Sequence, residues 1–199
     1  MEQLVVCTSN EGKMKEFRSL LPEHLGLLTL AEVGITEELP ETGETLEQNA
    51  MQKAKEAFGR CGLPCVADDT GLEVDVLQGA PGVRSARYAG GSRSAEANIR
   101  LLLAQLQGRQ PRTARFRTVL ALVDDLGEHL FEGTVDGVIL DSLRGTGGFG
   151  YDPVFLPKGS DRTFAEMTIT AKNMLSHRAL AVGRFVTFLK ERRLRDPIS

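Results

Sequence analysis

The chain has 199 residues, of which 41% are hydrophobic and 26% are charged, and its formal net charge at pH 7 is −3. This length and composition are typical of one globular domain, and the slightly acidic balance excludes a general attraction to nucleic-acid polymers. No hydrophobic run approaches the ~20 residues that a membrane-spanning helix needs, so we expect no contact with a membrane. An anionic ligand would need a local group of cationic side chains and backbone N–H groups, or a metal ion.

Strand-like and helix-like segments alternate along the chain, which predicts an α/β architecture. For the first half we expect a strand at residues 4–7, a polar turn at 8–12, a helix from 13, a helix at 44–58, and a strand at 64–67 that ends in Asp68-Asp69. For the second half we expect a glycine-rich loop at 71–91, a helix at 94–106, a hairpin of strands 115–123 and 129–140, a glycine-rich loop at 145–150, and a last helix after Ser176.

Three cysteines, Cys7, Cys61 and Cys65, make an odd count. Three residues separate Cys61 from Cys65, so the pair lacks the two-residue spacing of redox and zinc motifs. Residues 1–7 lack a basic segment followed by a long hydrophobic stretch, so we expect no secretory signal. These features predict free thiols in a reducing compartment, and hence a cytoplasmic protein.

The first candidate site is the polar run between the first strand and the first helix. Backbone N–H groups at a helix start have no intrahelical partner and lie at the positive end of the helix dipole, so they can bind phosphate. Gly12 permits close approach and Lys13 adds a full positive charge. The spacing is not that of a Walker loop. An ordinary helix cap with a surface lysine is the alternative interpretation. The run consists of Thr8, Ser9, Asn10, Glu11, Gly12 and Lys13.

The second candidate site is acidic and consists of Glu41, Asp68 and Asp69. Mg²⁺ is commonly bound by one or two protein carboxylates and takes its other ligands from water and substrate phosphates, so these residues could hold it. Adjacent strand residues point to opposite faces of a sheet, so we expect only one of the two aspartates to face the site. The alternative is a solvated acidic loop.

The third candidate site is the glycine-rich run from Gly145 to Pro153. Its spacing matches the dinucleotide-binding pattern, but no helix follows it, so a nucleotide-base pocket is the better interpretation. Phe149 offers a stacking face and Asp152 can accept from purine N–H groups. A tight turn with Phe149 in the core is the alternative. Lys172 and the pair His177-Arg178 could add donors to an oxygen of the base, or they could be a charged surface cap.

Taken together, these motifs resemble the inosine triphosphate pyrophosphatase family, in the family's order and over nearly the whole chain. The landmarks are Thr8-Ser9-Asn10-Glu11-Gly12-Lys13, Glu41-Thr42-Gly43, Glu47-Gln48-Asn49-Ala50 with Lys53, Ala67-Asp68-Asp69-Thr70-Gly71-Leu72, Gly79-Ala80-Pro81-Gly82, Ser85-Ala86-Arg87-Tyr88, Gly145 to Pro153, and Ser176-His177-Arg178. Thr70 stands where relatives often have Ser, and Ser9 where they often have Gly.

The resemblance implies one ITPase-like domain over residues 1–199, with two lobes, a long mixed sheet flanked by helices and a central cleft, and it implies a homodimer. Residues 8–13 and Lys53 would bind the triphosphate, Glu41 and Asp69 would hold Mg²⁺, and Asp69 would also be the catalytic base. The base and sugar pocket, together with Thr70 beside the acidic pair, completes the predicted substrate contacts. That pocket would consist of Phe149, Gly150, Tyr151, Asp152, Lys172, His177 and Arg178.

The implied reaction is Mg²⁺-dependent hydrolysis of ITP, dITP and XTP to the nucleoside monophosphate and pyrophosphate. Donors from His177 and Arg178 would favour the 6-oxo group of these purines over the amino group of adenine. Two alternatives remain at this point: a pyrophosphatase of the Maf-like type with another specificity, and a nucleotide sensor without turnover.

Overall fold

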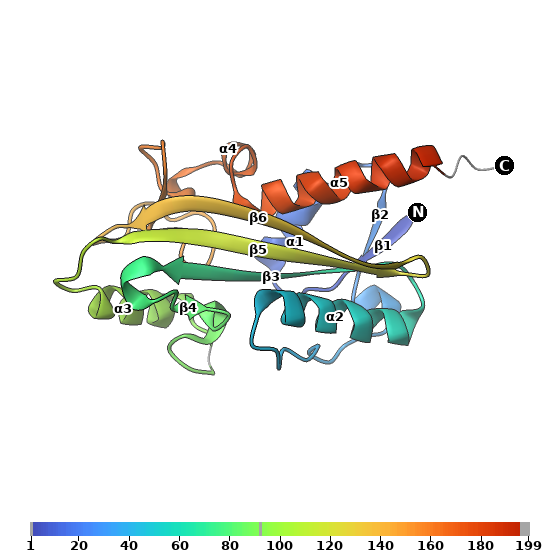
Figure 1. The fold of residues 1–199 in the computed structure, drawn as a ribbon, viewed down its shortest axis with the longest axis horizontal. Coiled ribbons are helices and arrows are strands. Elements are labelled where there is room, and N and C mark those ends of the chain that lie inside the picture. Colours follow the sequence, from blue (N-terminus) through green and yellow to red (C-terminus); the bar gives the residue numbers. More distant parts are fainter. Residues whose placement is uncertain (1, 92, 196–199) are drawn as a thin grey trace. The chain divides into compact units, whose positions relative to one another are not determined.

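The computed structural model describes residues 2–91 and 93–195. Within these residues, seven strands pair in the order β2-β1-β3-β5-β6-β7, with β4 beside β3 (Figure 1). The helices are α1 (Glu11–Leu20), α2 (Leu46–Cys61), α3 (Ala95–Gln105), α4 (Ile169–Asn173) and α5 (His177–Arg195). The strands are β1 (Gln3–Val6), β2 (Gly26–Thr29), β3 (Cys65–Val74), β4 (Pro81–Gly82), β5 (Thr113–Asp124), β6 (Gly127–Ile139) and β7 (Phe155–Pro157).

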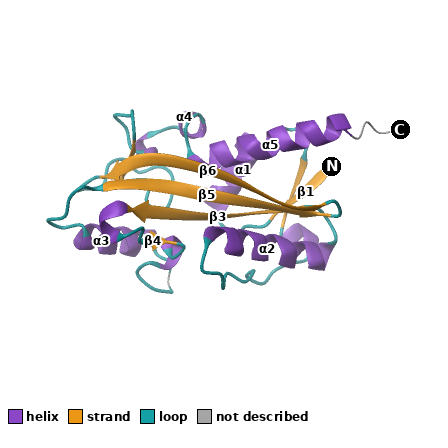
Figure 2. Cartoon of the chain, viewed as in Figure 1, coloured by secondary structure: helices purple, strands orange, loops and turns teal. Residues whose placement is uncertain are grey.

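The chain forms two compact units. The first contains Met1–Asp69, Thr118–Gly133 and Arg178–Ser199. Its strands β1, β2 and β3 run parallel, with Val5 opposite both Leu28 and Cys65. In this unit α2 lies on one side of the strands and α5 on the other (Figure 2). The α5 side contains a core of side chains from β1, α1, β3, β5 and α5, including Leu4, Phe17, Val66, Leu120 and Phe185.

The second unit contains Thr70–Arg117 and Thr134–His177. In it β4 pairs antiparallel with the end of β3, and β7 pairs antiparallel with β6, so the sheet is mixed. Three phenylalanines form the centre of its core. The ring of Phe116 lies 4.7 Å from Phe155 and 6.0 Å from Phe164, measured between centroids. These rings stabilise the unit by burial and by edge-to-face contact.

Local sequence signals explain where the helices begin. Asn10, Thr45 and Ser94 are the N-caps of α1, α2 and α3, and each side chain accepts a backbone N–H three residues further on. Such caps satisfy donors that the helix itself leaves unpaired. The structure therefore confirms the predicted helices, although α1 begins two residues earlier than the hydrophobic pattern indicates.

One predicted element is wrong in a way that matters for the site. The strand expected to end at Asp68-Asp69 continues to Val74, so β3 has ten residues and both aspartates lie inside it. The segment expected to be a loop from residue 71 accordingly begins as strand. Charged residues normally mark a strand end, but here ion pairs within the fold allow both carboxylates to be buried.

None of the helices in the described part of the chain combines the length and the hydrophobicity needed to cross a bilayer. All three cysteines are free thiols, as the sequence predicts.

Candidate active site

The polar run after β1 forms a capped helix start. The Oδ1 atom of Asn10 accepts the backbone N–H of Lys13 at 3.0 Å, and the Oγ1 atom of Thr8 accepts the backbone N–H of Asn10 at 3.1 Å. Ser9, Asn10 and Glu11 are exposed. The cap thus fixes the loop at the N-terminus of a ten-residue helix, where the positive end of the dipole favours an anion.

Asp68 and Asp69 face opposite sides of β3, as strand alternation requires. Asp68 lies among the cations of the first unit. Its Oδ2 atom accepts from Arg178 Nε at 3.1 Å and Nη2 at 2.8 Å, and its Oδ1 atom lies 3.1 Å from Lys13 Nζ. Arg178 also donates to Glu16. The two carboxylates therefore compensate a guanidinium that is only 1% exposed.

Asp69 lies on the side of β3 that faces α2. Its Oδ2 atom accepts from Asn49 Nδ2 at 3.2 Å, and its Oδ1 atom lies 3.5 Å from Lys53 Nζ. The same ammonium donates to Glu41 Oε1 at 2.6 Å and to the backbone carbonyl of Asp68 at 2.7 Å. Lys53 thus gathers Glu41 and Asp69 around one cationic group.

The loop that carries Glu41 is held by side chains of α2. Backbone N–H groups of Thr42, Gly43 and Glu44 donate to side-chain oxygens of three α2 residues, at 3.0, 2.8 and 2.7 Å respectively. Those acceptors are Gln52, Asn49 and Gln48. A Cβ on Gly43 would lie 2.6 Å from the Cβ of Gln48, so a larger residue does not fit there.

These amide side chains have a role that the sequence analysis missed. In the sequence, the Gln48-Asn49 pair is only a landmark of the family. The signal that could have found them is helical spacing, since Gln52 follows Gln48 by four residues and Asn49 by three, which brings it close to both on α2.

Charge and burial set different protonation tendencies for the four groups of this site. Burial raises the pKa of Asp69, and the nearby Lys53 opposes the rise without cancelling it. Burial would also raise the pKa of Asp68, but Lys13 and Arg178 outweigh it and hold that pKa well below its ordinary value. Burial lowers the pKa of Lys13. Burial alone would lower the pKa of Lys53, but the nearby carboxylates of Asp69 and Glu41 outweigh burial and raise that pKa.

Glu41 and Asp69 fit a hard divalent cation. Both are carboxylates, and both already contact one positive charge, the ammonium of Lys53. Mg²⁺ in proteins commonly uses one or two carboxylates and takes its other ligands from water and substrate phosphates. No cluster of three or more His, Cys, Asp or Glu side chains suited to a metal occurs among residues 2–91 and 93–195, so a full protein cage is not present in that part of the chain.

The glycine-rich run of the second unit encloses a buried ion pair. Lys172 Nζ donates to Asp152 Oδ2 at 2.6 Å, and the same carboxylate oxygen accepts the backbone N–H of Phe149 at 2.9 Å. The ammonium also lies 4.8 Å from the centroid of the Phe149 ring. Gly148 has a φ of +69°, and a Cβ there would collide with the Asp152 carboxylate, so only glycine fits.

Two further predicted pocket residues are buried in the second unit. Tyr151 donates its hydroxyl to the backbone carbonyl of Ser85 at 2.9 Å. The His177 ring stacks on Phe116, with centroids 4.7 Å apart and planes 24° apart. Gly150 and Thr70 are both half-buried, Gly150 in the glycine-rich run and Thr70 directly after Asp69 on β3.

His177 and Arg178 are sequence neighbours that belong to different units. His177 is part of the second unit, whereas the Arg178 guanidinium binds Asp68 and Glu16 in the first. Successive residues of a helix point about a quarter turn apart, so adjacency in the sequence does not bring two side chains to one partner.

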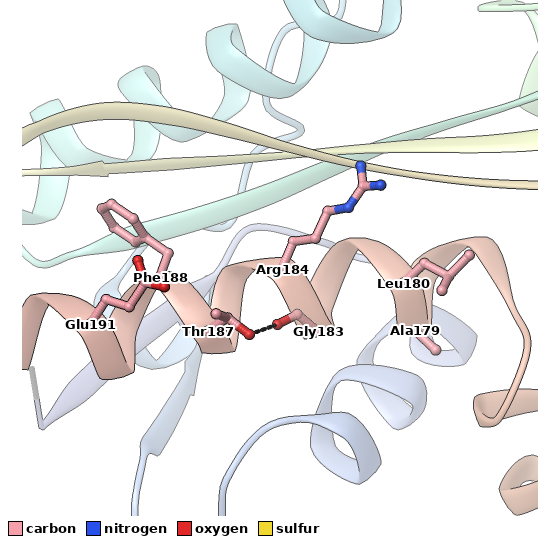
Figure 3. Close-up of a pocket in the computed structure, with 7 residues that line it drawn as sticks. All are labelled: Ala179, Leu180, Gly183, Arg184, Thr187, Phe188 and Glu191. Carbon is pink, nitrogen blue, oxygen red and sulfur yellow. Dashed lines mark hydrogen bonds between the residues drawn. The ribbon is translucent and has the colours of Figure 1, made fainter.

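A shallow groove of about 450 Å³ runs along α5 and involves none of the predicted site residues (Figure 3). Its lining includes Leu180, Gly183 and Thr187, and the Thr187 hydroxyl donates to the Gly183 carbonyl at 3.0 Å. Arg184, also on the lining, donates to the backbone carbonyl of Glu132 at 2.7 Å. All of the lining residues belong to α5, and none of them is a candidate catalytic or substrate-binding residue.

Relatives of known name resemble the chain over nearly its whole length. A protein from Porphyromonas gingivalis named dITP/XTP pyrophosphatase is 52% identical over 190 residues, which is 95% of this chain and 98% of that protein. A protein of the same name from Bacillus subtilis is 45% identical over 195 residues, covering 96% of this chain and 98% of that protein.

Solved structures give the same result for the fold. The Staphylococcus aureus Ham1 protein matches with a TM-score of 0.87 at 37% identity, covering 96% of this chain and 99% of that one. A HAM1 protein from Coxiella burnetii matches with a TM-score of 0.87 at 36% identity, covering 96% and 100%. These matches confirm the predicted α/β fold. The model of the Ham1 family matches residues 4–188, and the chain belongs to that family.

Proposed function

We propose that this protein hydrolyses the non-standard purine nucleoside triphosphates ITP, dITP and XTP to the nucleoside monophosphate and pyrophosphate. The observation that carries the proposal is the group formed by Glu41, Lys53 and Asp69, with Lys53 Nζ 2.6 Å from one carboxylate and 3.5 Å from the other. Two relatives that are 52% and 45% identical to the chain are named dITP/XTP pyrophosphatase, which supports the proposal.

The first unit supplies the groups that would bind the triphosphate. The capped start of α1, the ammonium of Lys13 and the ammonium of Lys53 all present positive charge. Positive groups fixed before the reaction stabilise charge that develops on the departing pyrophosphate. Ser9, Glu11 and Gly12 would contribute through the backbone of the loop, and Thr8 and Asn10 hold that loop in shape.

Asp69 is the proposed general base. Its carboxylate is held by Asn49 and lies near Lys53, and a carboxylate fixed in this way can act as a general base. It would take the proton of the water that attacks the α-phosphorus, while the bond from that phosphorus to the bridging oxygen breaks and pyrophosphate leaves. Mg²⁺ held by Glu41 and Asp69 would neutralise phosphate charge and acidify water. Lys53 keeps these two carboxylates close in spite of their mutual repulsion.

The second unit supplies the groups proposed to bind the base and sugar. Phe149 presents a ring, and Asp152 and Lys172 present an acceptor and a donor that are buried together. His177, Gly150, Tyr151 and Thr70 are the other proposed members of this set. Arg178 is proposed as a second donor to the 6-oxo group, although in this structure it binds Asp68 and Glu16.

The test is to incubate the purified protein with ITP, XTP, GTP or ATP, with Mg²⁺ and with a chelator, and to measure pyrophosphate and phosphate. Pyrophosphate from ITP and XTP in the presence of Mg²⁺, with little from ATP, supports the proposal. Comparable cleavage of ATP and ITP would refute the base selectivity. No pyrophosphate from any of them would favour a nucleotide sensor.

Cellular location and oligomeric state complete the proposal. A cytoplasmic location is consistent with the three free thiols. A homodimer follows from the resemblance described above, and light scattering should then give a mass near twice the chain's 21.7 kDa.

A further inference from the structure

Cys61 and Cys65 lie together at the junction of α2 and β3, away from the carboxylates of the site. Cys61 is the last residue of α2 and Cys65 is the first of β3. Their Sγ atoms are 3.7 Å apart. Gly62 has a φ of +65°, which turns the chain back after the helix and brings the two thiols face to face.

The two thiols differ in access. Cys61 is half-buried, whereas Cys65 is fully buried in the first unit. A third thiol, Cys7, also contacts Cys65 and is itself buried. The accessible thiol is placed to be oxidised first, and the buried thiol behind it is placed to act as the resolving cysteine that closes the disulfide. Disulfide formation suits the pair better than binding of a soft metal ion. The residues that the structure describes contain no group of three or more His, Cys, Asp or Glu side chains that could hold a metal.

We propose that Cys61 and Cys65 form an oxidisable thiol pair that closes to a disulfide when the folded protein meets a hydroperoxide. The Cys61 sulfur attacks the peroxide, the O–O bond breaks, and one equivalent of water or alcohol leaves as Cys61 becomes a sulfenic acid. The Cys65 sulfur then attacks Cys61, the S–O bond breaks and water leaves. The two thiols lose two electrons in total, and the peroxide gains them.

The surroundings of the pair make this reaction slow. Burial raises the pKa of Cys61, and the hydrogen bond with Cys7, followed by burial, raises the pKa of Cys65 well above its ordinary value. Little thiolate is present at neutral pH, and the thiolate is the reactive form. The pair therefore responds to sustained excess of peroxide and not to a brief pulse.

The experiment uses the full folded chain, exposed to graded hydrogen peroxide, then unfolded, alkylated and digested with trypsin. Trypsin cuts after Lys13, Arg60 and Arg84, so Cys7 and the Cys61–Cys65 pair fall in separate peptides. We expect peptide 61–84 to lose about 2 Da and to escape alkylation, because an internal disulfide removes two hydrogens. Reduction with dithiothreitol should restore alkylation at both sites.

Cys61→Ser and Cys7→Ser are matched variants. Cys61→Ser should abolish the 2 Da loss, and Cys7→Ser should retain it. A disulfide joining peptides 1–13 and 61–84 would show that Cys7 pairs with Cys61 or Cys65 and would overturn the proposal. So would oxygen addition without loss of hydrogen, or a disulfide that forms only after urea has unfolded the chain.

Discussion

Arg178 and Asp68 form an ion pair across 110 residues of sequence, in which Nε and Nη2 both donate to one carboxylate oxygen, Oδ2, at 3.1 and 2.8 Å. Each of the two residues is only 1% exposed. The pair joins the start of α5 to the middle of β3, so the strand that carries the proposed base Asp69 is fixed by a residue far along the chain. A buried pair of this kind is costly to break because the remaining charge has no solvent.

Removing the charge of Asp68 should therefore destabilise the fold. We expect Asp68→Asn to lower the free energy of unfolding by ~3–5 kcal/mol, measured by urea denaturation. Glu96 is the control, since its pair with Arg100 is largely exposed and spans one helical turn. Glu96→Gln should cost ~0.5 kcal/mol or less. Equal losses in the two variants would contradict the role of the buried pair.

The same carboxylate predicts how stability depends on pH. The folded-state pKa of Asp68 lies well below its ordinary value of 3.8, so the unfolded chain binds the proton more readily. Its contribution is fully present above that ordinary pKa and is lost as pH falls through the lower folded pKa. The melting temperature should be measured for both proteins from about pH 6 to about pH 3, a range that includes the typical Asp pKa of ~4. It should fall more steeply with decreasing pH for the wild type than for Asp68→Asn. Parallel curves would show that other groups dominate acid unfolding.

Lys53 should matter far more for activity than its neighbour Lys55. Lys53→Met removes the cation that holds Glu41 and Asp69 together and that would stabilise pyrophosphate, so we expect kcat/KM for ITP to fall by ~100-fold or more. Lys55 pairs with Glu128 on the surface and lies on the same helix. Lys55→Met should change kcat/KM less than ~3-fold. Similar losses in both variants would refute the assignment of Lys53.

Asp69→Asn should lower turnover while leaving the protein folded. Loss of a general base typically costs ~100- to 10,000-fold in rate. Asn49 and Lys53 still surround the new amide, and the melting temperature shows whether the fold persists. Asp125→Asn, in the turn between β5 and β6, is the control and should keep full activity. If Asp69→Asn turned over ITP at the wild-type rate, another group would be the base.

His177 should contribute to the preference for 6-oxo purines. With ATP, the His177 donor would face an amino group and stay unpaired, which costs ~1–3 kcal/mol. His177→Gln should therefore lower the ratio of kcat/KM for ITP to kcat/KM for ATP by about 5- to 150-fold. His129 packs on Phe188 and has no proposed contact with the substrate. His129→Gln should leave the ratio unchanged. An unchanged ratio in His177→Gln would place the selectivity elsewhere, with Arg178 the next candidate.

Local patterns predicted much of the fold. The helices expected at 44–58 and 94–106 correspond to α2 and α3, and the hairpin expected from the turn after residue 123 corresponds to β5 and β6. The pattern failed where partners are distant. Asp68-Asp69 predicted a strand end, but the strand continues because cations that are distant in the sequence, on α1, α2 and α5, allow both carboxylates to be buried.

The sequence by itself determined the α/β class, the family, the longer helices α1, α2, α3 and α5, and the set of polar residues available for phosphate, metal and base, but not the short elements β2, β4, β7 and α4. The tertiary structure alone decided which of them meet. It placed Asp68 with Arg178 and Asp69 with Lys53, and it used three α2 amides to hold the Glu41 loop. The reason is physical: capping and alternation depend on neighbours in the chain, whereas pairing buried charges depends on which side chains the fold brings within a few ångströms.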